Sequence, residues 1–386
     1  MVNIEQVVND KFPAISRRNP IVKNGLFRFL RWLCREQEIN RFLDKHQDVD
    51  AAEFVDLVLD YFDFSLVVSD SERENIPTEG RVVIIANHPI GTLDGLALLK
   101  LVRSVRRDVR IVANDVLMQF APLKPMLLPV DNMTQRGYKQ STTRILDALK
   151  NDEAVIVFPA GEVSRAGPAG IKDGRWQAGF LHFARKTNSP ILPIHVGGRN
   201  SSLFYSMSTL AKPLGTLMLL REMFKQRQVR LPVRIGQSIP MSQLDIDNLS
   251  NRDKAKLLKK HVYRLCKNRK PIFQTEKSIA HPEDRRTLRR ELKQSQLLGE
   301  TKDGKQIYLF DAPRNSIVMK ELGRLREISF RRVGEGSGEK RDLDNYDRYY
   351  RHIVLWDEDE LEIVGAYRFG DARILSKPDH PTGLYS

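Results

Sequence analysis

Three short apolar runs, each followed by turn residues, lie in the middle of the chain. They span residues 82–86, 154–157 and 190–196 and are rich in β-branched side chains. A continuous apolar run of this length predicts a strand that is buried on both faces, as in a parallel sheet. Segments with the composition of helices, such as residues 93–100, separate the runs. The pattern predicts an α/β fold over about residues 81–196, with a central, mostly parallel sheet flanked by helices.

The segments on either side of this region have different patterns. Near the N-terminus, Phe54, Tyr61 and Phe62 contribute to a crowded apolar face that is typical of a helix. Residues 274–298 are charged and poor in aromatic side chains, which predicts a solvated connecting helix. The predicted division of the chain is an N-terminal helical, membrane-proximal region at 1–68, the α/β domain at 69–270, a charged linker at 271–303 and a partial α+β unit at 304–386.

Composition and charge narrow the class of partner. The chain has 386 residues, too many for one ordinary domain, and a formal net charge of +14. Such a charge requires an acidic partner, and an anionic membrane surface, an acidic protein and nucleic acid are the candidates. We predict no nucleic-acid partner, because zinc-finger spacing, RNA-binding motifs and basic-zipper heptads are all missing. The two cysteines give no disulfide framework, which fits a reducing cytosol.

A further pattern concerns membranes. No apolar stretch reaches the roughly 18 residues that a spanning helix needs, and the N-terminus does not have the pattern of a secretory signal. Residues 25–43 combine leucine and aromatic side chains with arginines on one predicted amphipathic helix. Such a helix suits a membrane interface, but it is equally typical of a helix packed on the catalytic sheet. We expect a peripheral or monotopic protein at the cytoplasmic face of the inner membrane.

Candidate chemistry follows the first apolar run. Residues 87–94 read Asn-His-Pro-Ile-Gly-Thr-Leu-Asp, which puts His88 and Asp94 at the open end of a predicted strand. Ligands of α/β proteins bind at such strand ends. A carboxylate on one ring nitrogen of a histidine fixes the tautomer and leaves the other nitrogen free to take a proton. Taken alone, the two residues are also typical of a turn and a helix cap.

The other two runs are followed by their own polar blocks. The second opens into Phe-Pro-Ala-Gly-Glu-Val-Ser-Arg at 158–165, and the third carries Pro193. Backbone N–H groups around Gly161, together with Arg165, could bind a phosphate or carboxylate, and the basic Arg144 could extend that anion site. The candidate substrate-binding residues are Asn87, Gly161, Glu162, Arg165, Arg144 and Pro193. We predict no metal site, because no His/Cys/Asp cluster has ligand spacing.

In their order and spacing, the three blocks resemble the glycerolipid acyltransferase (PlsC-like) superfamily. That family usually has four residues between His and Asp and a glutamate after Phe-Pro; here five residues separate His88 from Asp94, and Ala160 stands in the glutamate position. Both departures look like the branch that acylates lyso-ornithine lipids, which is often called haemolysin-like. The resemblance implies that His88, oriented by Asp94, is the general base for O-acyl transfer from an acyl carrier protein or coenzyme A thioester, with no bound cofactor.

The last segment resembles the beginning of a GNAT-like N-acyltransferase. Residues 307–310, 352–356 and 362–368 predict strands, and residues 316–330 predict a helix. The positions that match that family are Arg326, Phe330, Asp344, Asp347 and Arg368. Since the sequence stops at residue 386, after about half of a GNAT fold, we expect this unit to be incomplete. The order of the two units resembles bifunctional ornithine lipid synthases.

Lyso-ornithine lipid is therefore the predicted acceptor. Two alternatives stay open. The first is a 1-acylglycerol-3-phosphate acyltransferase of phospholipid synthesis, which uses the same chemistry on a phosphate-bearing acceptor. The second belongs to another class: a non-catalytic, haemolysin-like protein that binds membranes without using His88 or Asp94.

Overall fold

The structure is a computed structural model that describes residues 5, 20–33, 35–113, 117–130, 135–167, 170–210, 219, 221–313 and 315–376. The chain forms two compact units, Met1–Thr275 and Glu276–Ser386. The seven-stranded sheet of the first unit has the order β1 (Ser65–Val67), β9 (Arg230–Ile235), β8 (Ile191–Val196), β2 (Val82–Ala86), β5 (Ala154–Val157), β3 (Val109–Ala113) and β4 (Leu127–Pro129).

This sheet is mostly parallel, as predicted. β2 pairs in parallel with β5 and β8, and only the β8–β9 pair is antiparallel. All of β2 is buried. Alternate β2 residues enter two separate apolar cores, with Ile84 in one and Ile85 in the other. Burial on both faces explains why these strands are continuous apolar runs rather than alternating ones.

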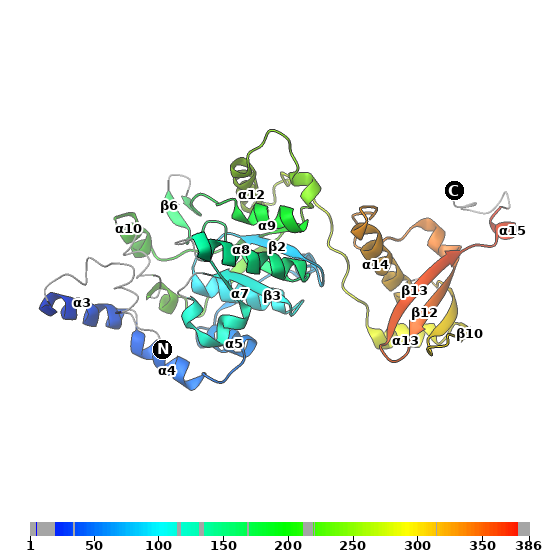
Figure 1. The fold of residues 1–386 in the computed structure, drawn as a ribbon, viewed down its shortest axis with the longest axis horizontal. Helices are drawn as coiled ribbons and strands as arrows, with labels where there is room; N and C mark the ends of the chain where they lie inside the picture. The colour runs from blue at the N-terminus through cyan, green and yellow to red at the C-terminus, as the bar shows by residue number, and fades with distance from the viewer. Residues whose placement is uncertain are drawn as a thin grey trace. The chain divides into compact units, whose positions relative to one another are not determined.

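Helices cover both faces of the sheet (Figure 1). The face with Ile84 packs on α3 (Pro20–Leu33), α4 (Glu36–Lys45), α5 (Ala51–Tyr61) and α7 (Thr92–Arg103). The face with Ile85 packs on α8 (Gln135–Lys150), α9 (Gly179–Thr187) and α12 (Asn251–Leu265). The smaller elements are α6 (Asp70–Arg73), α10 (Ser202–Leu210) and the hairpin of β6 (Arg165–Gly167) and β7 (Gly170–Lys172).

The N-terminal segment differs from the single amphipathic helix predicted over residues 25–43. It forms two helices, α3 and α4, because Arg35 between them has a left-handed φ of 52°. Phe27 and Leu30 are buried in the core of the first unit, whereas Phe29 and Trp32 are exposed. The buried face of α3 agrees with the interpretation as a helix packed on the domain, and contact of its exposed face with a membrane stays a prediction. Among the described helices, none has the length and apolar character needed to cross a bilayer.

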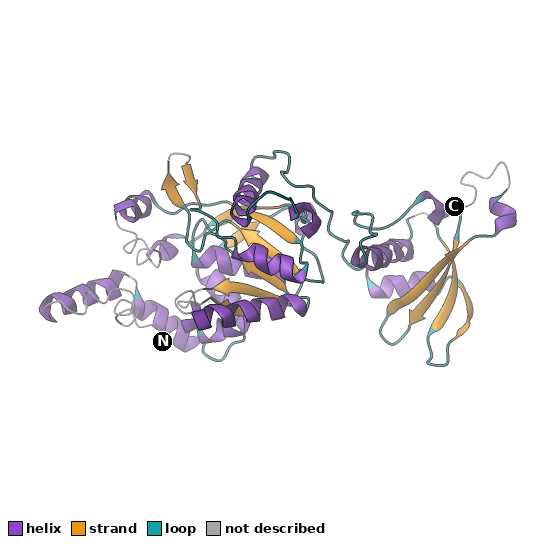
Figure 2. Ribbon diagram, turned by 45° about the horizontal axis from the view of Figure 1, so that its top comes forward, coloured by secondary structure: helices purple, strands orange, loops and turns teal. Residues whose placement is uncertain are grey.

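The second unit is an antiparallel sheet with helices on one face (Figure 2). The sheet contains β10 (Gln296–Glu300), β11 (Gln306–Asp311), β12 (Arg351–Asp357) and β13 (Glu362–Phe369), in that order. Its core is closed by α13 (Arg285–Leu292) and α14 (Ile317–Arg332), and α15 (Ala372–Leu375) follows the sheet.

The predicted charged linker is partly wrong. Helix α13 buries Leu288 and Leu292 in the core of the second unit, and β10 pairs with β11. Arginines fill the exposed face of α13, and the two leucines give too weak an apolar signal to mark it as a core helix by sequence. The second unit therefore begins at Glu276 instead of near residue 304.

Candidate active site

The loop that follows β2 carries the candidate base. His88 Nδ1 lies 3.0 Å from Asp94 Oδ1. Asp94 is fully buried in the first turn of α7, where its carboxylate also accepts the N–H groups of Ile90 at 2.9 Å and Gly91 at 3.2 Å. Free N–H groups at a helix start stabilise a negative charge. The loop makes room for five residues between His88 and Asp94 at Gly91, whose φ of 125° favours glycine.

The surroundings of His88 set its protonation. Burial lowers the pKa of His88, but the charge and hydrogen bonding of Asp94, together with the charge of Asp173, raise it, and the net effect is a pKa above the ordinary value. Phe158 stacks on the imidazole with 4.1 Å between ring centroids. Since Nδ1 faces Asp94, Nε2 is the nitrogen that can take a proton from a substrate hydroxyl.

Arg165 lies close to this loop and has unused hydrogen-bonding groups. The N–H of its neighbour Ser164 donates to the His88 carbonyl at 2.7 Å, which joins the two loops. The Arg165 guanidinium lies over the ring of Phe204 in α10 and has Nη2 at 3.5 Å from Glu162 Oε2. Its Nε and Nη1 are buried and donate to no described residue. A half-buried cation whose Nε and Nη1 groups are buried and unsatisfied fits an anionic ligand.

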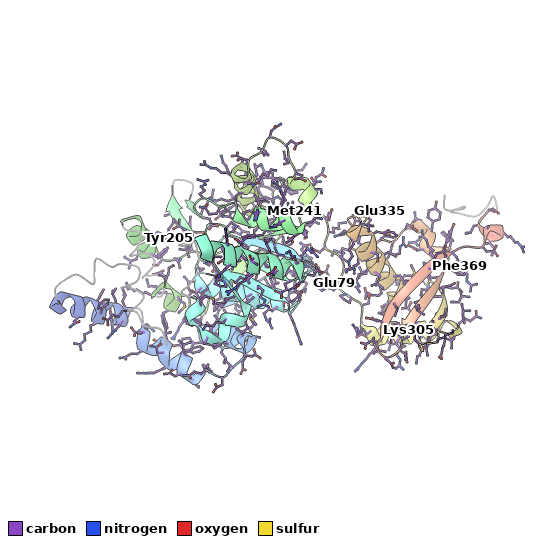
Figure 3. The ribbon with its side chains drawn as sticks, in the orientation of Figure 1. Glu79, Tyr205, Met241, Lys305, Glu335 and Phe369 are labelled. Atoms are coloured by element: carbon purple, nitrogen blue, oxygen red, sulfur yellow. The ribbon has the colours of Figure 1, made fainter. Side chains whose placement is uncertain are left out.

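Helix α10, which carries Phe204, is also linked to the His88 loop by hydrogen bonds through Asn200. Tyr205, labelled in Figure 3, accepts the N–H of Asn200 at 2.9 Å through its hydroxyl. The side chain of Asn200 in turn donates to the carbonyls of Pro89 and Ile90 in the His88 loop. The loop is thus held from the side of α10 as well as from α7.

Asn87 positions the loop instead of facing a substrate. Its side-chain amide donates to the Val196 carbonyl and accepts the Val196 N–H, both at 2.8 Å. The side chain is buried between the ends of β2 and β8. The pair of bonds fixes where the His88 loop leaves the sheet.

Three other residues were predicted to bind substrate, and the structure places them as follows. The N–H of Gly161 donates to the Phe158 carbonyl at 3.0 Å, so this turn uses the group that was predicted to bind an anion. Pro193 is buried inside β8, opposite Ile85 of β2. Arg144 is exposed on α8, and no hydrogen bond or ion pair joins it to the described residues of the site.

Sequence reasoning missed Asp173 and the role of Phe158. Asp173 follows β7 in an Asp-Gly pair, which in a sequence is typical of a turn. The fold places its carboxylate against the backbone N–H of His88, at 3.2 Å. Phe158 was part of the Phe-Pro motif, but its stacking on His88 depends on the pairing of β2 with β5. No local pattern in the sequence predicts either contact.

Two cavities lie near the N-terminal helices. A narrow apolar cavity of about 80 Å³ extends from Thr92 and Leu96 of α7 to Phe42 of α4 and Val58 of α5. A larger cavity of about 1290 Å³ has walls that mix charged side chains with apolar ones such as Phe27, Trp32 and Phe224. Its charged lining residues are Glu5, Arg28, Arg31, Arg35, Glu36, Glu38, Arg41, Arg221 and Lys225.

The second unit has a charged cluster of its own. Arg326 Nη1 lies 2.9 Å from Asp347 Oδ1, and Arg368 Nη1 contacts both Asp344 at 2.8 Å and Asp347 at 2.9 Å. Burial raises the pKa of Asp347, but hydrogen bonds and the neighbouring arginines lower it to about 2. The structure thus brings together four of the five residues predicted for this unit. Phe330, the fifth, is an exposed side chain of α14.

Comparison with known proteins agrees with this division of the chain. A model of the family described as "Acyltransferase" matches residues 6–270, and one described as "Acetyltransferase (GNAT) domain" matches residues 325–386. The PlsC 1-acyl-sn-glycerophosphate acyltransferase of Thermotoga maritima is a similar solved structure, with 20% identity and a TM-score of 0.38. That match covers 57% of this chain and 79% of the other.

Curated relatives match each unit separately. A lyso-glycine lipid O-acyltransferase of Bacteroides thetaiotaomicron is 29% identical over 252 residues, which cover 64% of this chain and 90% of the relative. A glycine N(alpha)-acyltransferase of the same organism is 38% identical over 95 residues, 24% of this chain and 28% of that protein. Since the first family model spans more than half of the sequence, the protein is an enzyme that belongs to the acyltransferase family.

Proposed function

We propose that the first unit transfers a fatty acyl group from an acyl thioester to the hydroxyl of a lyso-lipid. His88 Nε2 takes the hydroxyl proton, the oxygen attacks the thioester carbonyl, and the carbon–sulfur bond breaks. The protonated His88 then returns its proton to the leaving thiolate. The 3.0 Å separation of His88 Nδ1 from Asp94 Oδ1 carries this proposal, because a carboxylate at that place favours the tautomer that the base needs.

The acceptor that we propose is a lyso-lipid with an amino-acid head group, lyso-ornithine lipid or lyso-glycine lipid. Two relatives of the first unit are named lyso-glycine lipid O-acyltransferases, and the second unit resembles glycine N(alpha)-acyltransferases. The buried, unsatisfied N–H groups of Arg165 suit the carboxylate of such a head group. They suit a phosphate equally well, so 1-acylglycerol 3-phosphate is the acceptor to test against it.

The donor and the membrane are the other partners in this proposal. Trp32 and Phe29 are exposed on α3, beside the large cavity with its excess of arginines. Aromatic side chains next to basic ones favour an anionic bilayer surface. The same excess of positive charge favours acidic acyl carrier protein as the donor. We propose a peripheral enzyme at the cytoplasmic face of the inner membrane.

The test measures acyl transfer from acyl carrier protein and from acyl coenzyme A to three acceptors: lyso-ornithine lipid, lyso-glycine lipid and 1-acylglycerol 3-phosphate. We expect product from an amino-acid acceptor and a fall of about 10³- to 10⁴-fold in kcat for His88→Ala. Product from the phosphate acceptor alone would assign the enzyme to phospholipid synthesis. Transfer at the wild-type rate in folded His88→Ala would overturn the mechanism.

A further inference from the structure

Asp173 is a buried carboxylate that the mechanism above does not use. It follows β7, at the base of the hairpin that carries Arg165, because Arg165 pairs with Lys172 across the two strands. Its side chain is almost fully buried yet takes three hydrogen bonds. The donors are the His88 backbone N–H at 3.2 Å, the Ser164 hydroxyl at 2.6 Å and the Trp176 indole N–H at 2.8 Å.

These bonds form a closed ring between two loops. Asp173 Oδ1 accepts from both His88 and Ser164, while the Ser164 N–H donates back to the His88 carbonyl at 2.7 Å. Both backbone polar groups of His88 are therefore fixed to the base of the hairpin. Ser164 immediately precedes Arg165 in the sequence. The same ring of hydrogen bonds therefore also fixes the backbone position from which the Arg165 side chain extends.

The backbone of Asp173 is anchored from the opposite side by α12. Its N–H donates to the Tyr263 hydroxyl at 2.8 Å, and its carbonyl accepts from Lys259 Nζ at 2.5 Å. Lys259 also donates to the Gly174 carbonyl at 2.7 Å. Three donors hold the carboxylate and α12 holds the backbone, so Asp173 has little freedom to move; a buried charge is retained only where donors surround it.

We propose that Asp173 is a positioning residue for acyl transfer: it fixes His88 at one distance from the base of the β6–β7 hairpin, and so from Arg165. The base that takes the proton and the cation that holds the acceptor's anionic group then keep a single spacing. This inference rests on the role proposed above for His88. When the reacting groups are already held in the right geometry, the reaction loses less entropy in reaching the transition state, and the barrier is lower.

The charge of Asp173 gives the proposal a second consequence. It acts on His88 in addition to Asp94, and both carboxylates favour the protonated imidazole. The remaining titratable groups that face this network are Glu162, Arg165, Lys172, Lys259 and Tyr263. Removing the Asp173 charge should therefore lower the pKa of His88, so that the base becomes neutral at a lower pH.

The test compares three variants of the full chain that change one feature each. Asp173→Asn keeps an acceptor for His88 and Ser164 but loses the charge and turns a donor toward Trp176. Ser164→Ala opens the ring and keeps the charge, and Trp176→Phe removes the third donor and keeps the charge. The measurements are kcat/KM against pH with an acyl thioester donor, NMR titration of the His88 ring assigned with His88→Ala, and thermal unfolding.

For Asp173→Asn we expect a fall of up to about 100-fold in kcat/KM and a shift of both the acid limb and the His88 titration to lower pH. For Ser164→Ala and Trp176→Phe we expect a smaller fall and an unshifted titration. Folded Asp173→Asn with the wild-type kcat/KM and titration would overturn the proposal. Were that variant unfolded, wild-type kcat/KM in both folded control variants would overturn it instead.

The proposed function can fail separately from this inference. If His88→Ala kept full activity, His88 would not be the base, and the acyl-transfer measurements would no longer report on Asp173. The NMR titration needs no substrate and would still show whether the Asp173 charge acts on the His88 ring.

Discussion

Each unit of this protein contains a cluster of arginines and carboxylates, and the two clusters differ in how completely their charges are paired. In the second unit, Arg326 and Arg368 are both held by Asp347, with Asp344 as a further partner. In the first unit, Arg165 keeps two buried N–H groups without a described acceptor. A paired charge has its desolvation cost offset by its partner, whereas buried N–H groups without acceptors cost stability unless a ligand supplies the acceptors. From this difference we propose that the first cluster binds an anionic ligand, whereas the second belongs to the folded core of its unit.

Among the variants that test this comparison, Asp94→Asn should cause the largest loss of activity. The amide cannot hold the imidazole as the carboxylate does, and the loss of a carboxylate that orients a catalytic histidine costs on the order of 10³- to 10⁴-fold in kcat. Steady-state kinetics with an acyl thioester measures the change. Asp152→Asn, which alters a surface ion pair with Arg81, is the matched control and should retain the wild-type kcat.

Asp347→Ala should have its effect on stability instead. It removes the carboxylate that Arg326 and Arg368 share, but Arg326 keeps Asp342 and Arg368 keeps Asp344, so the loss in the free energy of unfolding of the second unit should be about 1–3 kcal/mol. Hydrogen exchange in β11 and β12 of the full chain reports this cost. Unchanged protection there, or a large loss of acyl transfer, would contradict the assignment of the two clusters.

The same cluster predicts that the stability of the second unit falls at low pH. The pKa of Asp347 is lowered to about 2 in the folded chain. Its contribution to the free energy of unfolding is therefore fully present above a pH of about 4, which is close to the ordinary pKa of an aspartate. The contribution is lost as the pH falls from about 4 to about 2 and amounts to about 2 kcal/mol. Hydrogen exchange of β12 in wild type should weaken over this range, and Asp347→Ala should remove that part of the change.

Arg165→Ala should act mainly on acceptor binding. Charge-assisted hydrogen bonds contribute about 1.5–3 kcal/mol each, so KM for the acceptor should rise by about 10- to 100-fold, with a smaller change in KM for the donor. Arg144→Ala removes an exposed arginine from α8 and should leave both constants unchanged. If the two variants behaved alike, Arg165 would be an ordinary surface cation.

Phe158→Leu should have the smallest effect. The leucine still fills space beside His88 but cannot stack on the imidazole, an interaction of about 0.5–1.5 kcal/mol. We expect kcat/KM to fall by about 2- to 10-fold, because the ring gains freedom to leave the productive orientation. An unaltered kcat/KM would show that Asp94 alone orients His88.

Much of the fold followed from the apolar pattern. The runs at 82–86, 154–157 and 190–196 became β2, β5 and β8, since burial on both faces leaves no polar positions in a strand. The strands and the helix predicted for the last segment are present as β11, α14, β12 and β13. A helix was predicted in the region of α13, but as a solvated linker, because only Leu288 and Leu292 of its eight residues face the core. A helix with so small an apolar face looks solvated until its partner is known.

The sequence by itself determined the α/β class, the pair His88 and Asp94, and the membership of the acyltransferase family, because short-range patterns encode buried strands and a local loop. Only the tertiary structure decided which other side chains contact and position His88 and Asp94. Asp173 lies 85 positions from His88 along the chain and reaches it through the β6–β7 hairpin. Gly161, Pro193 and Arg144 were candidates by motif or charge; in the fold Gly161 bonds within its own turn, Pro193 is buried in β8, and Arg144 is exposed on α8. Hydrogen bonds act over about 3 Å in space, and distance along the chain does not predict them.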